Sequence, residues 1–272
     1  MTINCGGNLI ELSTPKILGI VNLTPDSFYD GGSLRNDTHL LNKVEKMLLD
    51  GADFIDLGGY SSRPGATDIS IAEEIKRVAP IISLLKNEFP DILISIDTFR
   101  SEVAKTCLEN GATMINDISA GNLDKEMMPV IASFNAPYIM MHMKGTPQIM
   151  QSLSTYENIT EEVIFYFSEK ITSARALGIN DIIIDAGFGF AKTIDHNFEL
   201  LNNLELLQSL DVPLLTGISR KYMIYKTLQN TPSEALNGTT ALHMIALQKG
   251  SKILRVHDVV AAKECILSLI HI

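Results

Sequence analysis

Tryptophan is absent from this chain of 272 residues, and cysteine is rare. The three cysteines, Cys5, Cys107 and Cys265, lie far apart and form no CxxC pair. An odd number of widely spaced cysteines is typical of free thiols in a reducing compartment and argues against a disulfide-stabilised scaffold.

Basic side chains are outnumbered by acidic ones, and the formal net charge is −10. General nucleic-acid binding requires a basic face, so this charge argues against a nucleic-acid partner. A small anionic substrate stays possible, provided that cationic side chains gather locally at its site. The charge therefore favours small-molecule chemistry over binding to a polyanion.

Long apolar runs are missing too. No stretch approaches the ~20 residues needed to cross a bilayer, and the amino-terminal segment MTINCGGNL lacks the basic and apolar regions of a signal peptide. Apolar residues nevertheless make up 46% of the chain, an ordinary share for a packed core. We expect a soluble, cytoplasmic, globular protein with no membrane partner.

Short apolar runs alternate with longer amphipathic segments from Lys16 onward. The runs are typical of strands buried on both faces, and the segments of helices. Capping residues at Ser70 and Thr231 mark two helix starts. Glycines 51, 111, 178 and 250 mark helix ends. The expected strands are 17–21, 53–57, 92–96, 114–116, 138–141, 182–185, 214–217 and 253–256, and helices include 39–49, 72–87, 100–110 and 159–177.

Eight strand–helix units of about 32 residues each predict a closed (β/α)₈ TIM barrel of the α/β class, rather than an open doubly wound sheet. No Pro-, Gly- or Ser-rich linker interrupts the chain. We therefore expect a single domain, 1–272, in which residues 17–272 form the barrel. Residues 1–16 would be an amino-terminal extension that closes one end.

Polar side chains follow the predicted strands at one rim, where such barrels carry their active sites. A single aspartate such as Asp97 is more often a helix cap than a functional group, but eight placements at one rim favour a site. These placements are Asn22, the segment 58–65, Asp97, Asn116 with Asp117, His142, Asp185, the segment 219–221, and Arg255 with His257 and Asp258.

Other motifs are weaker. The segment 187–191 resembles half of a dinucleotide fingerprint, but its third glycine is replaced and no acidic residue follows at the expected distance, so a tight turn is favoured. His142 could ligate a metal or fill the barrel mouth, and the lack of a second ligand at suitable spacing favours the filler. We find no catalytic triad, zinc-binding histidine pair or P-loop.

Taken together, the residue types at the rim indicate which ligand groups they could bind. Asn22 offers a hard oxygen suited to Mg²⁺, which takes few protein ligands and completes its shell with phosphate and water. Arginine, lysine and histidine side chains at the rim could neutralise a diphosphate. Asp97, Asn116 and Asp185 form an acceptor set that suits a flat heterocycle with several N–H donors.

Six segments make the chain recognisable: 19–32, 56–65, 95–98, 115–117, 217–221 and 255–258. They contain VNLTPDSFYDGG, DLGGYSSRPG, SIDT, IND, GISRK and RVHD. From Ile17 to Val259 the chain resembles the dihydropteroate synthases of the pterin-binding barrel superfamily. That resemblance implies that 6-hydroxymethyl-7,8-dihydropterin diphosphate and p-aminobenzoate combine to give 7,8-dihydropteroate and diphosphate. It also implies Mg²⁺ as cofactor and a homodimer.

The resemblance implies a role for each rim residue. It assigns the pterin ring to Asp97, Asn116, Asp185 and Lys221. It assigns diphosphate to Asn22, Arg63, Arg255 and His257, with Asn22 as the metal ligand. It assigns p-aminobenzoate to Phe28, Ser62, Pro64, Lys221 and Tyr222. The expected catalytic residues are Asp97, Lys221, Arg255 and His257.

The chain departs from the family pattern at three places. Tyr60 stands where glutamate is usual, Ala191 replaces a glycine in the segment 185–192, and Tyr222 replaces the serine that follows the family lysine. The last change concerns a position expected to meet the p-aminobenzoate carboxylate. The side chains expected to bind pterin and diphosphate are all retained.

Two other functions fit the same fold. A pterin-dependent methyltransferase that works with a corrinoid partner would share the barrel and some pterin contacts, but it would not need the diphosphate residues. A non-catalytic paralogue that only binds pterins should have lost Asn22, Arg63, Lys221 or Arg255, and all four are present.

Overall fold

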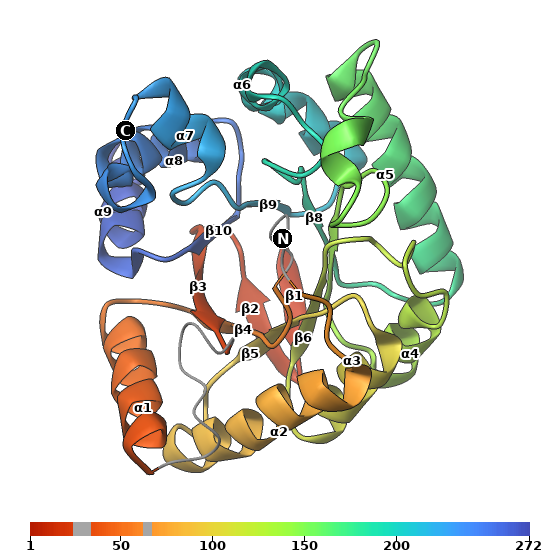
Figure 1. The fold of residues 1–272 in the computed structure, drawn as a ribbon, viewed down its shortest axis with the longest axis vertical. Coiled ribbons are helices and arrows are strands. Elements are labelled where there is room, and N and C mark those ends of the chain that lie inside the picture. Colours follow the sequence, from red (N-terminus) through yellow and green to blue (C-terminus); the bar gives the residue numbers. More distant parts are fainter. Residues whose placement is uncertain (24–33, 62–66) are drawn as a thin grey trace.

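The parallel strands close into a barrel that is surrounded by helices, as Figure 1 shows for this computed structural model. The structure describes residues 1–23, 34–61 and 67–272. The barrel order is β10-β3-β4-β5-β6-β7-β8-β9, and β10 pairs with β3 to complete the ring. The barrel strands are β3 (Lys16–Asn22), β4 (Phe54–Gly58), β5 (Ile94–Asp97), β6 (Met114–Asp117), β7 (Tyr138–Met141), β8 (Ile182–Asp185), β9 (Leu214–Thr216) and β10 (Ile253–Val256).

Helices connect successive strands on the outside of the barrel (Figure 1). They are α1 (Leu34–Leu49), α2 (Ile71–Glu88), α3 (Ser101–Glu109), α4 (Met127–Phe134), α5 (Ile159–Ala176), α6 (Ile194–Asn202), α7 (Tyr222–Thr227), α8 (Leu236–Gln248) and α9 (Val259–Leu269). Short 3₁₀ turns are η1 (Met150–Leu153), η2 (Leu204–Leu210) and η3 (Pro232–Glu234). The predicted (β/α)₈ barrel is confirmed.

Two layers of apolar side chains hold the barrel together. The larger layer lies between the strands and the helices and includes Ile17, Ile55 and Val78. The smaller one fills the barrel interior near the amino ends of the strands, with Leu18 and Phe54 among its members. Neighbouring strand residues thus belong to opposite layers, which is why both faces of each strand are apolar.

The amino-terminal hairpin of β1 (Thr2–Cys5) and β2 (Asn8–Glu11) lies over the middle of the barrel in Figure 1. Ile3, Cys5 and Leu12 are buried in the inner apolar layer, so the extension closes the amino end of the barrel as expected. All three cysteines are free and buried. Burial raises the pKa of the Cys5 thiol to about 12, which makes this thiol unreactive.

Helix ends follow the predicted signals, with two differences. Glycines 51, 111, 178 and 250 have positive φ, as helix-terminating residues do. Helix α1 begins at Leu34, five residues before the expected start at 39, because its first turn is too polar to show an apolar period. The capping box at Thr231 opens the 3₁₀ turn η3, and α8 begins only at Leu236.

Ser70 caps α2 by accepting from the Glu73 backbone N–H at 3.1 Å. The Glu73 side chain does not bond back to the Ser70 backbone N–H, as a full capping box would require, because its carboxylate pairs with Arg77 at 2.9 Å. Within the described ranges, no helix combines the length and the apolar character that crossing a bilayer requires.

Candidate active site

The predicted rim residues meet at the carboxyl end of the barrel. Asn22, Asp97 and Asp185 are the last residues of β3, β5 and β8. Asn116 lies in β6 and Arg255 in β10, each one residue before its strand ends. Because parallel strands in one barrel end at the same rim, residues from five strands surround one mouth. Phe28, Ser62, Arg63 and Pro64 lie outside the described residues.

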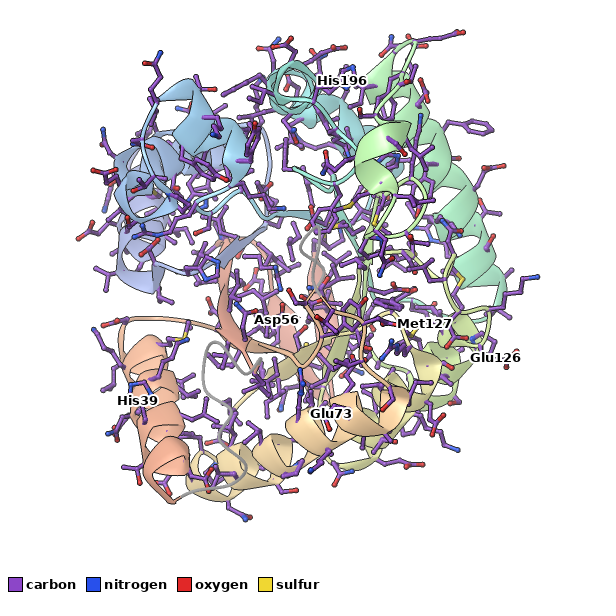
Figure 2. The ribbon with its side chains drawn as sticks, in the orientation of Figure 1. His39, Asp56, Glu73, Glu126, Met127 and His196 are labelled. Carbon is purple, nitrogen blue, oxygen red and sulfur yellow. The ribbon has the colours of Figure 1, made fainter. Side chains whose placement is uncertain are left out.

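Arg255 is held between two acidic side chains. Its Nε donates to Asp56 Oδ2 at 2.6 Å, and a terminal nitrogen donates to Asp97 Oδ2 at 2.5 Å. Asp56 is fully buried on β4, near the middle of the molecule in Figure 2. This arrangement fixes the plane of the guanidinium, since both ends of the group are paired.

Asp56 was not predicted as a site residue, yet it organises this side of the mouth. Besides Arg255, its Oδ2 accepts from Asn116 Nδ2 at 3.1 Å. That bond leaves the Asn116 carbonyl oxygen available as an acceptor for a ligand. In the sequence, Asp56 is the single carboxylate of an otherwise apolar strand, FIDLG. It comes two residues after Phe54, which belongs to the inner apolar layer, so both side chains lie on the same face of the strand.

The ionisation of Asp97 is shaped by opposing effects. Burial raises the pKa of Asp97 to about 7, while the Arg255 guanidinium favours the anion and Asp56 disfavours it. The carboxyl group therefore titrates near neutrality, where a modest change in its surroundings changes its charge.

On the opposite side of the mouth, Asp185 and Lys221 form a second group. Asp185 Oδ1 accepts from the Gly187 backbone N–H at 2.9 Å. A side chain on Gly217 would place its Cβ 3.5 Å from Asp185 Oδ2, so the glycine keeps the space beside the carboxylate open. Burial raises the pKa of Asp185, and Lys221 opposes that shift.

Lys221 is the first residue after the loop that follows β9, just before α7. Its Nζ donates to the Phe188 carbonyl oxygen and lies 4.7 Å from the centre of the Phe190 ring. Burial lowers the pKa of Lys221 to about 8, although Asp185 favours the charged amine. The neighbouring Tyr222 is exposed and packs edge-on against Tyr225, with ring centres 5.5 Å apart.

Asn22 could supply one ligand of a metal ion, but not a complete set. Its Oδ1 and Asp97 Oδ2 would each lie 3.8 Å from a Cβ placed on Gly58, so both oxygens face the same small space. In the described part of the chain, no three His, Cys, Asp or Glu side chains gather as metal ligands. A single neutral oxygen suits Mg²⁺ that arrives with a diphosphate and keeps several waters.

His257 and Arg220 lie where β9 and β10 lead into their helices. His257 is exposed, and its backbone N–H donates to Ser219 Oγ at 3.2 Å. Arg220 pairs with both oxygens of Asp258, at 2.7 and 2.9 Å, and also donates to two carbonyls of η3. This arginine therefore ties the two rim loops together and is not available to a diphosphate.

Tyr60, which stands where the family pattern has glutamate, is buried. Its ring packs edge-on against Phe99 at 5.1 Å, and the Arg100 guanidinium lies 5.0 Å from the ring centre. Its hydroxyl accepts from Gln148 Nε2 at 3.2 Å. Tyr60 thus connects the end of β4 to the segment after β7 by a hydrogen bond, and to the segment after β5 by ring contacts.

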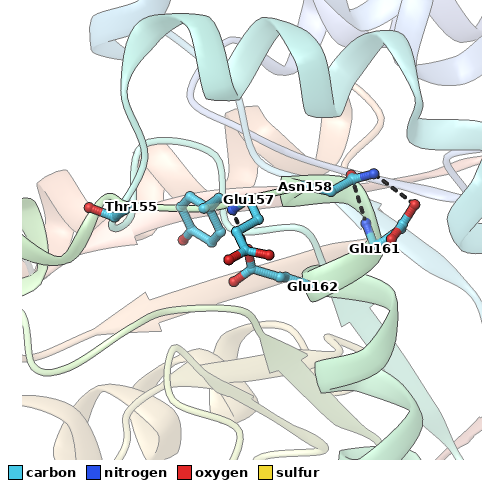
Figure 3. A pocket seen from close by; sticks show the side chains of 6 residues that line it. Thr155, Glu157, Asn158, Glu161 and Glu162 are labelled. Carbon is cyan, nitrogen blue, oxygen red and sulfur yellow. Dashed lines mark hydrogen bonds between the residues drawn. The ribbon is translucent and has the colours of Figure 1, made fainter.

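Two surface pockets lie beside α5, away from Asp97, Asp185 and Lys221. One of about 370 Å³ is lined by residues 155–158, Glu161 and Glu162 at the start of α5 (Figure 3). Its polar groups are already used: Asn158 caps α5, and Glu162 pairs with Lys144 at 2.9 Å. A second, of about 580 Å³, lies beside it along α5. The first contains no residue of the predicted rim, and the second is lined in part by His142, the rim residue that follows β7.

The comparisons with known proteins agree with this fold. The profile described as "Pterin binding enzyme" matches residues 18–257. A dihydropteroate synthase of Synechocystis is 45% identical over 248 residues, which is 90% of this chain and 86% of that protein. The Yersinia pestis dihydropteroate synthase in complex with a sulfonamide drug superposes with a TM-score of 0.93, at 37% identity, covering 100% of this chain and 98% of the other.

A Xanthomonas albilineans dihydropteroate synthase with bound 4-aminobenzoic acid superposes with a TM-score of 0.91, at 36% identity, covering 99% of this chain and 97% of the other. The chain therefore belongs to the family of pterin binding enzymes. Within that family it is one of the dihydropteroate synthases, which are transferases.

Proposed function

We propose that this protein joins 6-hydroxymethyl-7,8-dihydropterin diphosphate to p-aminobenzoate, giving 7,8-dihydropteroate and diphosphate, with the rim residues in the roles below. The observation that carries the proposal is the meeting of acceptors and cations at one barrel mouth. Asp97, Asn116 and Asp185 supply acceptors, and Lys221 and Arg255 supply positive charge. This set matches a donor-rich ring that carries an anionic leaving group.

The pterin ring binds between Asp185 and Asn116. A pterin presents a ring N–H and an exocyclic amine side by side, and a carboxylate accepts from such a planar pair with both oxygens. The open space beside Gly217 supports ring access to Asp185. The hydrogen bond from Asn116 to Asp56 supports an acceptor role for the remaining amide oxygen.

The diphosphate binds at the β3 and β10 side of the mouth. Asn22, Arg255 and His257, together with Arg63, are the residues we assign to it. Asn22 would hold Mg²⁺, which would supply neutralisation of the negative charge on the diphosphate. Arg255 adds a fixed guanidinium, since Asp56 and Asp97 already hold its plane.

p-Aminobenzoate binds beside Lys221. Its carboxylate is an anion that a buried amine attracts, and the Phe190 ring near Lys221 Nζ offers an aromatic surface. Tyr222, exposed beside Lys221, stands where the family serine is expected to meet that carboxylate. Phe28, Ser62 and Pro64 complete the proposed site.

In the reaction, the C–O bond at the pterin methylene breaks and its electron pair leaves with diphosphate. The ring nitrogens delocalise the positive charge left on the methylene carbon, and the Asp97 carboxylate stabilises that cation electrostatically. The aniline nitrogen then forms the C–N bond and releases a proton. No protein nucleophile is required. Exclusion of water matters because water would compete for the cation.

A product assay tests this function. The purified protein, supplied with the pterin diphosphate, Mg²⁺ and p-aminobenzoate, should form 7,8-dihydropteroate and release one diphosphate per turnover. Pterin binding without product would instead identify a non-catalytic paralogue. Methyl transfer from methyltetrahydrofolate to a corrinoid would identify the methyltransferase alternative.

We also propose a homodimer. Helices α7 to α9 expose Leu228, Leu236, Ile245, Val260 and Leu267, whereas Ile266 of α9 faces the barrel. Helices α8 and α9 pack side by side and carry four of these exposed side chains, Leu236, Ile245, Val260 and Leu267. The three free, buried cysteines support a further proposal that the enzyme acts in the reducing cytoplasm.

A further inference from the structure

Lys192 is a buried lysine that the chemistry above does not use, and burial lowers its pKa well below the ordinary value of a lysine. It is the residue before the cap of α6, and only 4% of its surface is exposed. Its Nζ donates to the carbonyl oxygens of Gly187 at 3.0 Å and Phe190 at 3.1 Å. Nζ also lies 2.9 Å from His142 Nδ1. The His142 carbonyl oxygen lies 3.4 Å from Nζ as well, so every N–H of the amine has an acceptor within reach.

His142 is an equally buried partner. Its ring is enclosed edge-on by Tyr166, with ring centres 4.9 Å apart, and its surface is 2% exposed. Burial lowers the pKa of His142 well below its ordinary value, and the charge of Lys192 acts in the same direction. A neutral imidazole keeps a lone pair, so Nδ1 accepts from Lys192 and is not free to ligate a metal.

The turn between β8 and α6 wraps around this pair. Gly187 has φ +69°, and a Cβ there would lie 2.1 Å from the His142 carbonyl oxygen. Ala191 has φ +48°, a left-handed conformation that favours glycine. Tyr156 donates to the Ala191 carbonyl oxygen at 2.9 Å from the other side. The turn is thus strained and closely packed, and Lys192 binds it from within.

The same turn carries two groups that meet Lys221. The Phe188 carbonyl oxygen accepts from Lys221 Nζ, and the Phe190 ring faces that amine. Asp185, by contrast, is the last residue of β8, where its carbonyl oxygen accepts from the His142 backbone N–H at 3.0 Å, and its carboxylate meets the turn only at its start, through the Gly187 backbone N–H at 2.9 Å. Displacement of the turn would therefore disturb Lys221 more than Asp185.

We infer that Lys192 and His142 are positioning residues for the p-aminobenzoate site: they hold the β8–α6 turn so that the Phe188 carbonyl and the Phe190 ring orient Lys221. This inference rests on the p-aminobenzoate site proposed above. It predicts a larger effect on p-aminobenzoate than on the pterin, because the pterin residues Asp97, Asn116 and Asp185 lie on the strands and only Lys221 is shared by both substrates.

The first test replaces the amine by an apolar chain of similar length. Lys192→Met should raise the KM for p-aminobenzoate roughly tenfold or more, which corresponds to about 1.4 kcal/mol, and leave the KM for the pterin diphosphate within about threefold. Lys170→Met is the matched control, because Lys170 is also a partly buried lysine but lies on α5. Its kinetics should equal those of the parent.

A lower kcat with both KM values unchanged would show a merely structural role and overturn the inference. His142 provides a second test if Lys192→Met does not fold. His142→Asn keeps an acceptor near the Nδ1 position and should retain the p-aminobenzoate KM, whereas His142→Leu should raise it. Equal KM values in the two variants would overturn the inference.

Lys221→Ala separates this inference from the proposed function. If Lys221→Ala leaves the p-aminobenzoate KM unchanged, the proposed site is wrong. If Lys221→Ala raises that KM while Lys192→Met and His142→Leu do not, the site stands and only the positioning role fails.

Discussion

Two pairs of oppositely charged side chains face each other across the barrel mouth. Arg255 lies against Asp97, and Lys221 lies near Asp185. Their ionisations differ, because burial raises the pKa of both acids and lowers that of Lys221, while Arg255 stays fully charged. At the residue scale, the proposed chemistry depends on which of these groups are charged when substrate arrives.

Asp185→Asn should weaken pterin binding more than it slows chemistry. The substitution replaces one acceptor oxygen by an NH₂ group, which then faces the N–H groups of the ring. We expect a loss of binding free energy on the order of 3 kcal/mol, or roughly 100-fold in affinity. The pterin KM should rise accordingly, since the ring is held in both ground and transition states. Asp211→Asn, at an exposed acid in a turn, is the control. Parental pterin affinity in Asp185→Asn would mean that the ring binds elsewhere.

Asp97 and Lys221 predict a bell-shaped pH profile for kcat/KM. The Asp97 anion is lost as pH falls through its pKa of about 7, and the Lys221 cation is lost as pH rises through its pKa of about 8. Activity should therefore be highest between these values. Asp97→Asn should lower kcat and abolish the acid limb, apart from any slope due to the substrate diphosphate. An unchanged acid limb in that variant would exclude Asp97 as its source.

At the scale of elements, the β8–α6 turn combines backbone strain with close packing. Gly187→Ala adds a Cβ that would lie 2.1 Å from the His142 carbonyl oxygen, on a backbone with φ +69°. We expect a loss of about 3 kcal/mol or more in the free energy of unfolding. Gly178→Ala is a matched control, because φ is +87° there but nothing lies within 4 Å. It should lose only about 1 kcal/mol.

Urea unfolding of both variants measures this difference. Equal losses would mean that conformational strain alone matters and that the turn adapts to the added methyl group. Since Lys192 and Tyr156 bind the turn from two sides, we expect adaptation to be small.

At the scale of the whole molecule, the exposed apolar side chains of α7 to α9 predict self-association. Leu267→Glu places a charge within that surface and should convert the dimer to a monomer in sedimentation experiments. Leu206→Glu is the control, since Leu206 is similarly exposed, at 52% against 47%, but lies in η2. A purely monomeric parent would contradict the dimer, and a dimeric Leu267→Glu would locate the interface elsewhere.

Metal binding is also a property of the assembled site. With Asn22 as the protein ligand, Mg²⁺ should bind weakly in the absence of diphosphate, with no resolvable heat at about 1 mM metal. Addition of diphosphate should make binding measurable by titration calorimetry. Tight binding of Mg²⁺ alone would require a set of ligands other than the one proposed.

Much of this architecture follows from local patterns in the chain. Apolar runs bounded by glycines predicted the barrel strands within a few residues, because a strand buried on both faces must be apolar throughout. The polar residues that end those runs, such as Asp97 and Asp185, predicted the rim, because parallel strands of one barrel end on the same side. Helix α1 began earlier than expected because its polar first turn has no periodic signal.

Contacts between distant segments could be assigned only from the folded chain. Asp56 and Arg255 are 199 positions apart, and they meet because β10 closes the ring beside β3, whose other neighbour is β4. His142 and Lys192 are 50 positions apart and meet inside a turn. When both faces of a strand are apolar, hydrophobicity does not reveal which residues point into the barrel. The register between strands decides that orientation, and with it the partner of every buried charge.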